Sequence, residues 1–316
     1  MHRAFQGMMT PLITPLAGGE LDVDALVTLI EMLLERGEVS GLIALGTTGE
    51  GPLLGPTLSR QVIVHTARCV GGRVPLVVNV SSTDLERVTE LARFAAERGA
   101  EAVTLTPPWY YRATDDELID WCVRVASASP LPVLLYNMPS HAGAAFHDAT
   151  YRALMDEDGI IGVKDSGGDW HAFERLIDLA ASHRDDWTIL AGPEAWLVPA
   201  MRRGASGATV SSNQIAPEAW AALHRAAIRN DPDAQAITKE LADTFASMMS
   251  IARGDAASAK TIKAAMSLLG LCRNETASPL RPCSPAEVQA IGQHLSRLQS
   301  AVIEIDTPDA LTPSKP

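Results

Sequence analysis

Residues 75–105 read PLVVNVSSTDLERVTELARFAAERGAEAVTL and contain one strand–helix–strand unit. The apolar runs Pro75–Val80 and Ala102–Leu105 predict short strands. Between them, Asp84–Arg98 is amphipathic and predicts a helix, with Ser82-Thr83-Asp84 as capping residues before Leu85. A strand, a helix and a second strand in this order predict parallel strands joined by a right-handed crossover.

The same unit recurs along the first 225 residues. Six further strands are expected at Met8–Ile13, Gly41–Leu45, Val133–Tyr136, Ile160–Lys164, Thr188–Ala191 and Gly207–Val210. Further helices are expected at Asp24–Arg36, Leu58–Cys69, Asp116–Ala128, His171–Ser182 and Glu194–Arg203, and Thr114-Asp115-Asp116-Glu117 is a second capping sequence. Eight such units favour a closed (β/α)₈ TIM barrel of the α/β class. An open doubly wound sheet would need a GxGxxG turn after the first strand, and none follows Ile13.

The pattern changes after Val210, where four helical segments follow with no strand between them. These segments are Pro217–Arg229, Pro232–Ala252, Ala257–Leu269 and Pro285–Leu298. We therefore expect a barrel catalytic domain over residues 1–225 and a C-terminal helical domain over residues 226–300. Residues 301–316 are polar and Pro-rich, and we expect a flexible tail there.

Composition excludes several classes of protein. The chain has 316 residues, 47% hydrophobic and 20% charged, so it can bury a sizeable core. Its net charge of −12 repels a phosphate backbone and disfavours nucleic acid as a partner. No run approaches the roughly 18 apolar residues of a membrane span, and residues 1–15 do not resemble a signal peptide. The four cysteines form no CxxC pair, which is typical of reduced thiols, and we expect a cytoplasmic protein.

Lys164 ends the sixth predicted strand, and active sites of TIM barrels lie at the carboxyl ends of the strands. It is the only lysine before Lys239, and Arg occupies the other Lys/Arg positions of that span. Arg does not lose its proton in proteins, whereas a desolvated lysine amine does and then attacks a ketone to form a Schiff base. The alternative is a lysine paired with Asp165 or extended out of the barrel end.

The carboxyl ends of other predicted strands also carry polar and aromatic groups. Tyr136 ends the neighbouring strand, where its phenol either transfers protons beside Lys164 or only packs at the barrel top. The segment GTTGEG, residues 46–51, either turns its amides inward to bind an anion or is a simple glycine-rich turn. The segment TPPWYY, residues 106–111, either walls a pocket or forms a buried or subunit contact. The eight histidines form no HxH, HxxH or HExxH motif, so no metal site is expected.

Together, the motifs at these strand ends resemble those of the dihydrodipicolinate synthase/N-acetylneuraminate lyase family. GTTGE at residues 46–50, YNMP at 136–139 and GVKDSGGD at 162–169 occur in the order and spacing of that family. The likeness continues through AGPE at 191–194, GASGATVSSN at 204–213 and IKAAMSLLGL at 262–271. It implies a (β/α)₈ barrel with C-terminal helices, a homotetramer built as a dimer of dimers, and class I Schiff-base chemistry on pyruvate or related 2-oxo acids without a cofactor.

The resemblance also assigns roles to residues. Lys164 matches the Schiff-base lysine, and Tyr136 matches the central acid/base tyrosine. The other matched positions are Thr47 and Thr48 near the substrate carboxylate and proton relay, Tyr110 completing that relay across a subunit contact, and Gly192 and Thr209 lining the pocket.

One position departs from the family. Dihydrodipicolinate synthases carry an Arg after YNxP that holds the carboxylate of the aldehyde substrate, and here His141 occupies that position. His lacks the bidentate fork of Arg. Arg112, on the loop after the fourth strand, is the other side chain that could supply a guanidinium.

We therefore expect a lyase that forms or cleaves a C–C bond between pyruvate and an aldehyde. The expected substrates are a 2-keto-3-deoxy acid, a hydroxy-oxoglutarate or a sialic-acid-like compound. The alternatives are a 4-hydroxy-tetrahydrodipicolinate synthase, or a 2-keto-3-deoxy acid dehydratase or deaminase that uses the same lysine. A third class, a barrel that only binds a 2-oxo acid as a sensor, would not need the reactive amine of Lys164.

Overall fold

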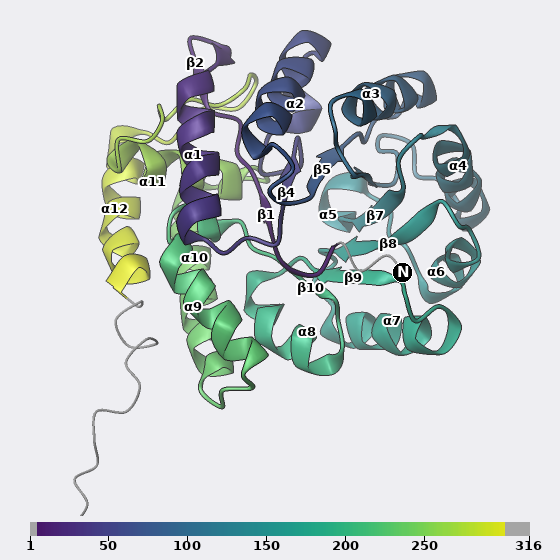
Figure 1. Cartoon of the computed structure of the whole chain (residues 1–316). Coiled ribbons are helices and arrows are strands. Elements are labelled where there is room, and N and C mark those ends of the chain that lie inside the picture. The colour runs from purple at the N-terminus through teal and green to yellow at the C-terminus, as the bar shows by residue number, and fades with distance from the viewer. Residues whose placement is uncertain (1–4, 301–316) are drawn as a thin grey trace, which may run out of the picture.

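The computed structural model describes residues 5–300, and its centre is a closed barrel of eight parallel strands (Figure 1). The strands follow one another around the barrel in the order β1-β10-β9-β8-β7-β6-β5-β4, with β1 paired to β4 to complete the ring. Their bounds are β1 Gly7–Pro11, β4 Gly41–Ala44, β5 Leu76–Asn79, β6 Ala102–Leu105, β7 Val133–Asn137, β8 Ile160–Asp165, β9 Thr188–Ala191 and β10 Gly207–Thr209. The predicted (β/α)₈ class is confirmed.

Two of the helices that surround the barrel, α3 and α4, begin at the predicted capping sequences. The Asp84 side chain accepts a hydrogen bond from the amide of Glu86, and Thr114 and Glu117 form a reciprocal capping box. The helices are α1 Val23–Arg36, α2 Pro56–Val70, α3 Leu85–Glu97, α4 Asp115–Ala128, α5 Pro139–Ala142, α6 Asp148–Met155, α7 Trp170–His183 and α8 Leu197–Arg203. The helices α5 and α6 were not predicted, nor was the two-stranded hairpin β2 Leu16–Ala17 and β3 Glu20–Leu21.

One end of the barrel interior is filled with apolar side chains. Eight of them form a buried cluster, namely Phe5, Met9, Ile43, Val77, Ala102, Leu134, Ile161 and Leu190. On β7, Leu134 belongs to this cluster, and Tyr136 lies two residues further along the strand. Tyr136 points to the same inner face as Leu134, because alternate residues of a strand share a face. Polar residues that follow the cluster along the strands therefore lie toward the carboxyl-terminal mouth of the barrel.

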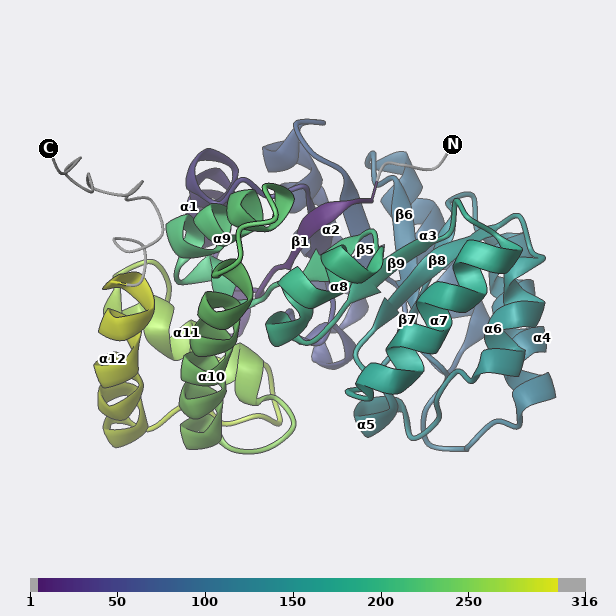
Figure 2. The same cartoon turned by 90° about the horizontal axis from the view of Figure 1, so that it is seen from below.

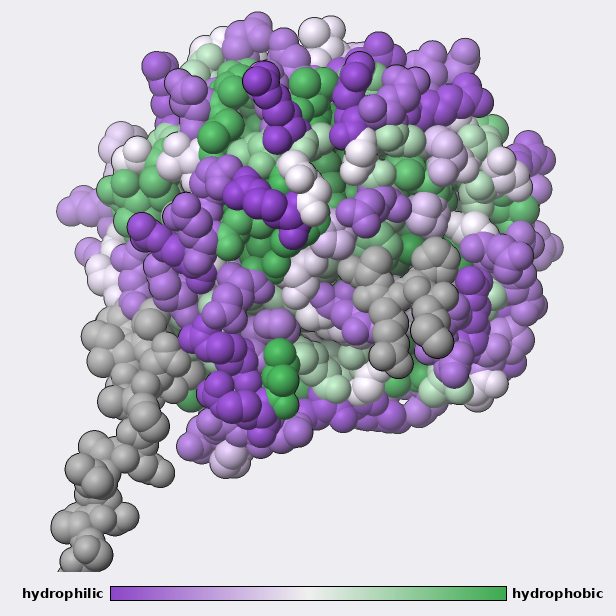
Figure 3. All heavy atoms as spheres, viewed as in Figure 1, coloured by the Kyte–Doolittle hydropathy of each residue, from purple (hydrophilic) through white to green (hydrophobic). Residues whose placement is uncertain are grey.

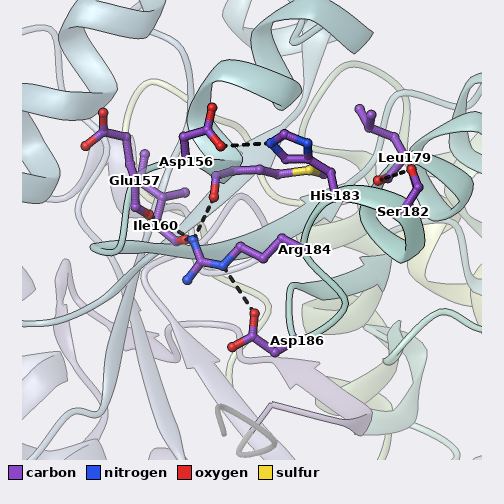
Figure 4. A network of polar contacts seen from close by, with 9 residues as sticks. Asp156, Glu157, Ile160, Leu179, Ser182, His183, Arg184 and Asp186 are labelled. Atoms are coloured by element: carbon purple, nitrogen blue, oxygen red, sulfur yellow. Dashed lines mark hydrogen bonds and ion pairs between the residues drawn. The ribbon is translucent and has the colours of Figure 1, made fainter.

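A polar network on the outside of the barrel ties β8 to its neighbouring helices (Figure 4). The Arg184 guanidinium donates from Nη1 to the carbonyls of Met155, Glu157 and Ile160, each at 3.0 Å. Its Nε donates to Asp186 at 3.2 Å, and His183 contacts Asp156 at 2.8 Å. Carbonyls at the end of α6 and at the start of β8 thus receive donors, which fixes the strand that carries Lys164.

Within the described part of the chain, four α-helices follow the last strand and gather on one side of the barrel (Figures 1 and 2). They are α9 Pro217–Ile228, α10 Ala234–Ala252, α11 Ala257–Leu268 and α12 Pro285–Ser300. The α10 helix packs against both α11 and α12. The expected domain boundary at residues 225/226 falls inside α9, which also contacts α1 and α8, so the division into two domains stays a prediction. The expected tail, residues 301–316, lies outside the described residues.

Hydrophilic side chains cover much of the face shown in Figure 3, with smaller apolar patches between them. Within residues 5–300, no helix combines the length and the apolar character that a membrane crossing needs.

Candidate active site

Lys164 lies on the inner face of the barrel near the end of β8. It pairs in register with Tyr136 on β7 and with Leu190 on β9, and only 6% of its surface is exposed. Its Nζ is 4.2 Å from the centre of the Tyr136 ring. The structure therefore brings together the two residues that the sequence singled out most strongly.

Asp165, the next residue, points to the other face of β8. Its carboxylate accepts hydrogen bonds from the Asn137 amide at 2.7 Å, the Tyr151 hydroxyl at 3.1 Å and the Gly167 backbone N–H at 2.9 Å. Burial and the nearby Asp165 charge raise the pKa of Tyr151. Because Asp165 is held on that face, the alternative of a Lys164–Asp165 ion pair is wrong; no salt bridge of Lys164 occurs among the described residues.

The Tyr136 hydroxyl lies 3.1 Å from the Thr47 hydroxyl, so Thr47 and Tyr136 form a hydrogen-bonded pair beside Lys164. Either oxygen can donate. A hydroxyl that both donates and accepts is suited to passing a proton between a substrate and a neighbouring group.

The loop that carries Thr47 and Thr48 is a compact series of turns. The amides of Gly49, Glu50 and Gly51 donate to carbonyls of Gly46 and Thr47 at 3.0–3.2 Å. A Cβ at Gly51 would lie 1.8 Å from the Leu45 carbonyl oxygen, which explains the glycine there. These three amides are therefore occupied within the loop, and anion binding by the remaining amides of the segment stays a prediction.

Two adjoining cavities open at the barrel mouth. One, of about 440 Å³, is lined by Lys164 together with Thr48, Gly192 and Thr209. The other, of about 420 Å³, extends past Trp109 toward Leu280. Both are lined by Thr47, Tyr136, Met138, His141 and Asp255. The α10 and α11 helices contribute residues such as Phe245 and Ser258 to the wall of the first cavity, so the C-terminal helices border the site.

Gly192 allows β8 and β9 to approach each other beside Lys164. Its amide donates to the Asp165 carbonyl at 2.6 Å, and a Cβ there would lie 2.0 Å from the Ser166 hydroxyl and 2.6 Å from that carbonyl oxygen. Thr209 is buried at the end of β10, and its hydroxyl donates to the Ala191 carbonyl at 3.3 Å.

Glu194 was not among the predicted site residues, although it lines the cavity of Lys164. Its carboxylate accepts hydrogen bonds from the backbone N–H and the hydroxyl of both Ser211 and Ser212. Burial raises the pKa of Glu194, and these donors oppose the rise. The acidic residue of AGPE and the serines of VSSN were both visible in the sequence, but only the fold places them together.

His141 lies on α5 at the edge of both cavities. Its Nε2 is 3.2 Å from the Asp255 carbonyl, and its Nδ1 is 2.9 Å from the Ser140 hydroxyl. A carbonyl only accepts, so Nε2 carries the proton and donates to Asp255. Arg112 does not line either cavity. Of the described residues that line them, Lys164 and His141 are the basic ones.

Tyr110 is the one predicted catalytic residue that the structure does not bring to Lys164. Its side chain is 86% exposed, it lines neither cavity, and its ring packs edge-on against Tyr111 at 4.9 Å between centroids. Its backbone has φ of 81°, an uncommon conformation for a residue other than glycine.

Within residues 5–300, no three His, Cys, Asp or Glu side chains cluster in a way that could hold a metal ion.

Comparison with known proteins agrees with this fold. A model of the dihydrodipicolinate synthetase family matches residues 4–298. A 4-hydroxy-tetrahydrodipicolinate synthase of Phenylobacterium zucineum is 31% identical over 89% of this chain and 93% of its own length. The structure of dihydrodipicolinate synthase from Bacteroides thetaiotaomicron superposes with a TM-score of 0.86, at 32% identity, over 92% of this chain and 98% of that one. YagE, an E. coli K12 prophage protein of the same family solved with pyruvate, superposes with a TM-score of 0.87, at 26% identity, over 93% of this chain and 99% of its own.

The fold and the family match define a TIM-barrel lyase of the class I aldolase type. The chain belongs to the dihydrodipicolinate synthetase family.

Proposed function

We propose that Lys164 forms a Schiff base with the C2 carbonyl of pyruvate. The neutral amine attacks C2, a carbinolamine forms, and loss of water gives the iminium ion. The observation that carries this proposal is the position of Lys164, whose amine is buried at the barrel mouth and faces the Tyr136 ring.

Tyr136 is the acid/base in this mechanism, and Thr47 is its hydrogen-bonding partner. Tyr136 supplies the proton with which the carbinolamine oxygen leaves as water, and the resulting phenolate accepts the proton lost from C3 of the iminium to give an enamine. The enamine carbon attacks the aldehyde carbon, and the Tyr136 hydroxyl protonates the new alkoxide. Water then hydrolyses the iminium, which releases the product and frees the Lys164 amine. In cleavage the same bonds break in reverse order. Thr48, Gly192 and Thr209 line the space beside Lys164, where we place the carboxylate and methyl group of pyruvate.

The second reactant is proposed to be an uncharged, hydroxylated aldehyde, released from a 2-keto-3-deoxy acid or a similar compound. The polar groups that line the two cavities include hydroxyls and carboxylates, and none of the described lining residues is an arginine. His141, the residue at the position of the family's carboxylate-binding Arg, is bonded to Asp255 and Ser140 instead. A negatively charged aldehyde would therefore lack its bidentate partner.

The second candidate is 4-hydroxy-tetrahydrodipicolinate synthase, in which pyruvate condenses with aspartate-semialdehyde. It is favoured by the similar curated proteins, which carry this name at identities of up to 31%. These comparisons support the synthase more directly than they support cleavage of any keto-deoxy acid. The two candidates share Lys164 and Tyr136 and differ only in the second reactant.

We further propose that the enzyme works in the cytoplasm as a dimer of dimers, and that Tyr110 of one copy completes the relay of another. The exposed Tyr110–Tyr111 pair supports such a contact, because large aromatic side chains are enriched at protein interfaces.

A direct assay separates the candidates. The unmodified enzyme is incubated with pyruvate and aspartate-semialdehyde, and separately with a panel of 2-keto-3-deoxy acids, and products are identified by mass spectrometry. We expect pyruvate to be released from at least one keto-deoxy acid and only weak condensation with aspartate-semialdehyde. Robust condensation with aspartate-semialdehyde and no cleavage of the panel would establish the synthase. If pyruvate is neither consumed nor released in any reaction, both candidates fail.

A further inference from the structure

A buried ion pair joins the loop of Thr47 and Thr48 to the C-terminal helices. Glu50 ends the GTTGE segment, and its Oε1 lies 2.5 Å from Nζ of Lys263 in α11. The side chains are 1% and 0% exposed. The second carboxylate oxygen, Oε2, accepts the backbone N–H of Ala277 at 2.5 Å, so both oxygens are held by groups beyond the barrel.

The backbone around Glu50 depends on this restraint. Glu50 has φ of 58°, a left-handed conformation that a residue with a Cβ adopts at a cost. Its amide donates to the Thr47 carbonyl at 3.1 Å, so its placement is transmitted directly to the residue that bonds Tyr136. A continuous chain of contacts therefore runs from Lys263 through Glu50 and Thr47 to Tyr136.

Burying the Glu50–Lys263 pair costs desolvation free energy, which indicates a role for the pair beyond packing. Lys263 sits among the buried apolar residues Ile262, Ala264, Ala265 and Met266, and burial lowers the pKa of its amine while Glu50 opposes that change. Apolar residues of similar volume often stabilise a fold as well as a buried ion pair does. An ion pair, unlike an apolar contact, fixes both the position and the direction of the carboxylate.

We propose that Glu50 and Lys263 are positioning residues, which hold Thr47 against Tyr136 so that α11 is part of the framework for proton transfer. This inference rests on the proposed Schiff-base function of Lys164. It assigns no direct contact with substrate to either residue. Loss of the pair is expected to slow proton transfer at C3 of pyruvate more than it reduces formation of the Schiff base.

The test compares two readouts in the full-length protein. Borohydride trapping at saturating pyruvate measures how much Schiff base forms at equilibrium. Exchange of the C3 protons of pyruvate in D₂O, followed by NMR, measures proton transfer. We expect Lys263→Met and Glu50→Gln each to retain trapping close to the unmodified level and to slow exchange by roughly tenfold or more, a loss at the low end of what a positioned acid/base group contributes. Lys263→Arg, which keeps the charge, should restore part of the rate.

Two further variants keep the test decisive. Arg124→Met removes the cation of an exposed ion pair with Asp120 on α4, which lines neither cavity, and we expect normal trapping and exchange. The double variant Glu50→Gln/Lys263→Met leaves no buried charge unpaired, so it provides a folded protein if a single variant unfolds, and its exchange should still be slow.

The inference is overturned if folded Glu50→Gln and the double variant both exchange within twofold of the unmodified protein. It is also overturned if trapping and exchange fall by the same factor in each variant, since that is the result of general damage to the site. Failure of the proposed function looks different, because the unmodified protein itself would then give neither adduct nor exchange.

Discussion

Lys164 and Asp165 are neighbours in the sequence and lie on opposite faces of the barrel wall. On the outer face Asn137 and Tyr151 hold Asp165, whereas on the inner face Lys164 lies beside Tyr136, its neighbour in register on β7. The sequence could identify Lys164 and Tyr136, because each ends an apolar strand. It could not identify the partners of Asp165 or the contact of Glu194 with Ser211 and Ser212. Those contacts depend on which strands are neighbours in the barrel.

The substitution Tyr136→Phe tests the assignment of Tyr136 as the acid/base. The ring is kept, so pyruvate should still bind, but the hydroxyl that faces Thr47 is lost. We expect turnover to fall by about 10²–10⁴-fold. Steady-state kinetics measure the loss, and Thr47→Val should give a smaller loss in the same direction. Turnover within threefold of the unmodified enzyme would make Tyr136 a packing residue.

Among the elements, the eight strands were predictable because each is a short apolar run bounded by a helix. The β2–β3 hairpin was not, since strands of two residues create no periodic pattern. The buried Lys263 was also missed, although it interrupts an otherwise apolar face of α11. The role of Lys263 could not be predicted, because its ion-pair partner Glu50 is distant in the sequence and adjacent only in the folded protein.

The close approach of β8 and β9 at Gly192 predicts that a larger residue there destabilises the protein. Gly192→Ala places a Cβ against Ser166 and the Asp165 carbonyl, and the backbone that carries Lys164 must move. We expect a loss of about 1–3 kcal/mol in the free energy of unfolding, with reduced turnover. Denaturant unfolding and kinetics measure the two effects. Gly55→Ala is the matched control, because nothing lies within 4 Å of a Cβ there. Equal stability of the two variants would refute the close-approach argument.

The α5 helix gives a second prediction. His141→Arg introduces a guanidinium at the edge of both cavities, at the position where synthases of this family hold the aldehyde carboxylate. A hydrogen bond to a charged group contributes about 1.5–3 kcal/mol, so condensation with aspartate-semialdehyde should rise by roughly tenfold or more. Cleavage of keto-deoxy acids should not improve. An unmodified enzyme that already condenses aspartate-semialdehyde efficiently, and does not gain from the substitution, would contradict this role for position 141.

In the whole molecule, the barrel supplies Lys164 and Tyr136, and the helices α10 and α11 border the same mouth. The exposed Tyr110 is the predicted site residue that a single chain leaves outside. The role of Tyr110 comes from the family resemblance and not from sequence patterning, because subunit contacts leave no periodic signal of their own.

Subunit mixing tests the proposed role of Tyr110. Tyr136→Phe and Tyr110→Phe should each be nearly inactive. If Tyr110 serves the site of another copy, refolding the two variants together creates some sites with both tyrosines intact. We expect recovery of about a quarter of the unmodified activity from a random equal mixture of two-fold pairs. No recovery, with mixed oligomers confirmed by native mass spectrometry, would place Tyr110 outside the relay of a second copy.

Borohydride reduction in the presence of pyruvate is the most direct test of Lys164 as the nucleophile. The unmodified protein should gain one reduced pyruvate adduct per chain, and peptide mass spectrometry should locate it on Lys164. Lys164→Ala and Lys164→Arg should both fold and form no adduct, because Arg keeps the charge without a nucleophilic amine. An adduct on another lysine of the unmodified protein, or an undiminished adduct in either variant, would contradict the account.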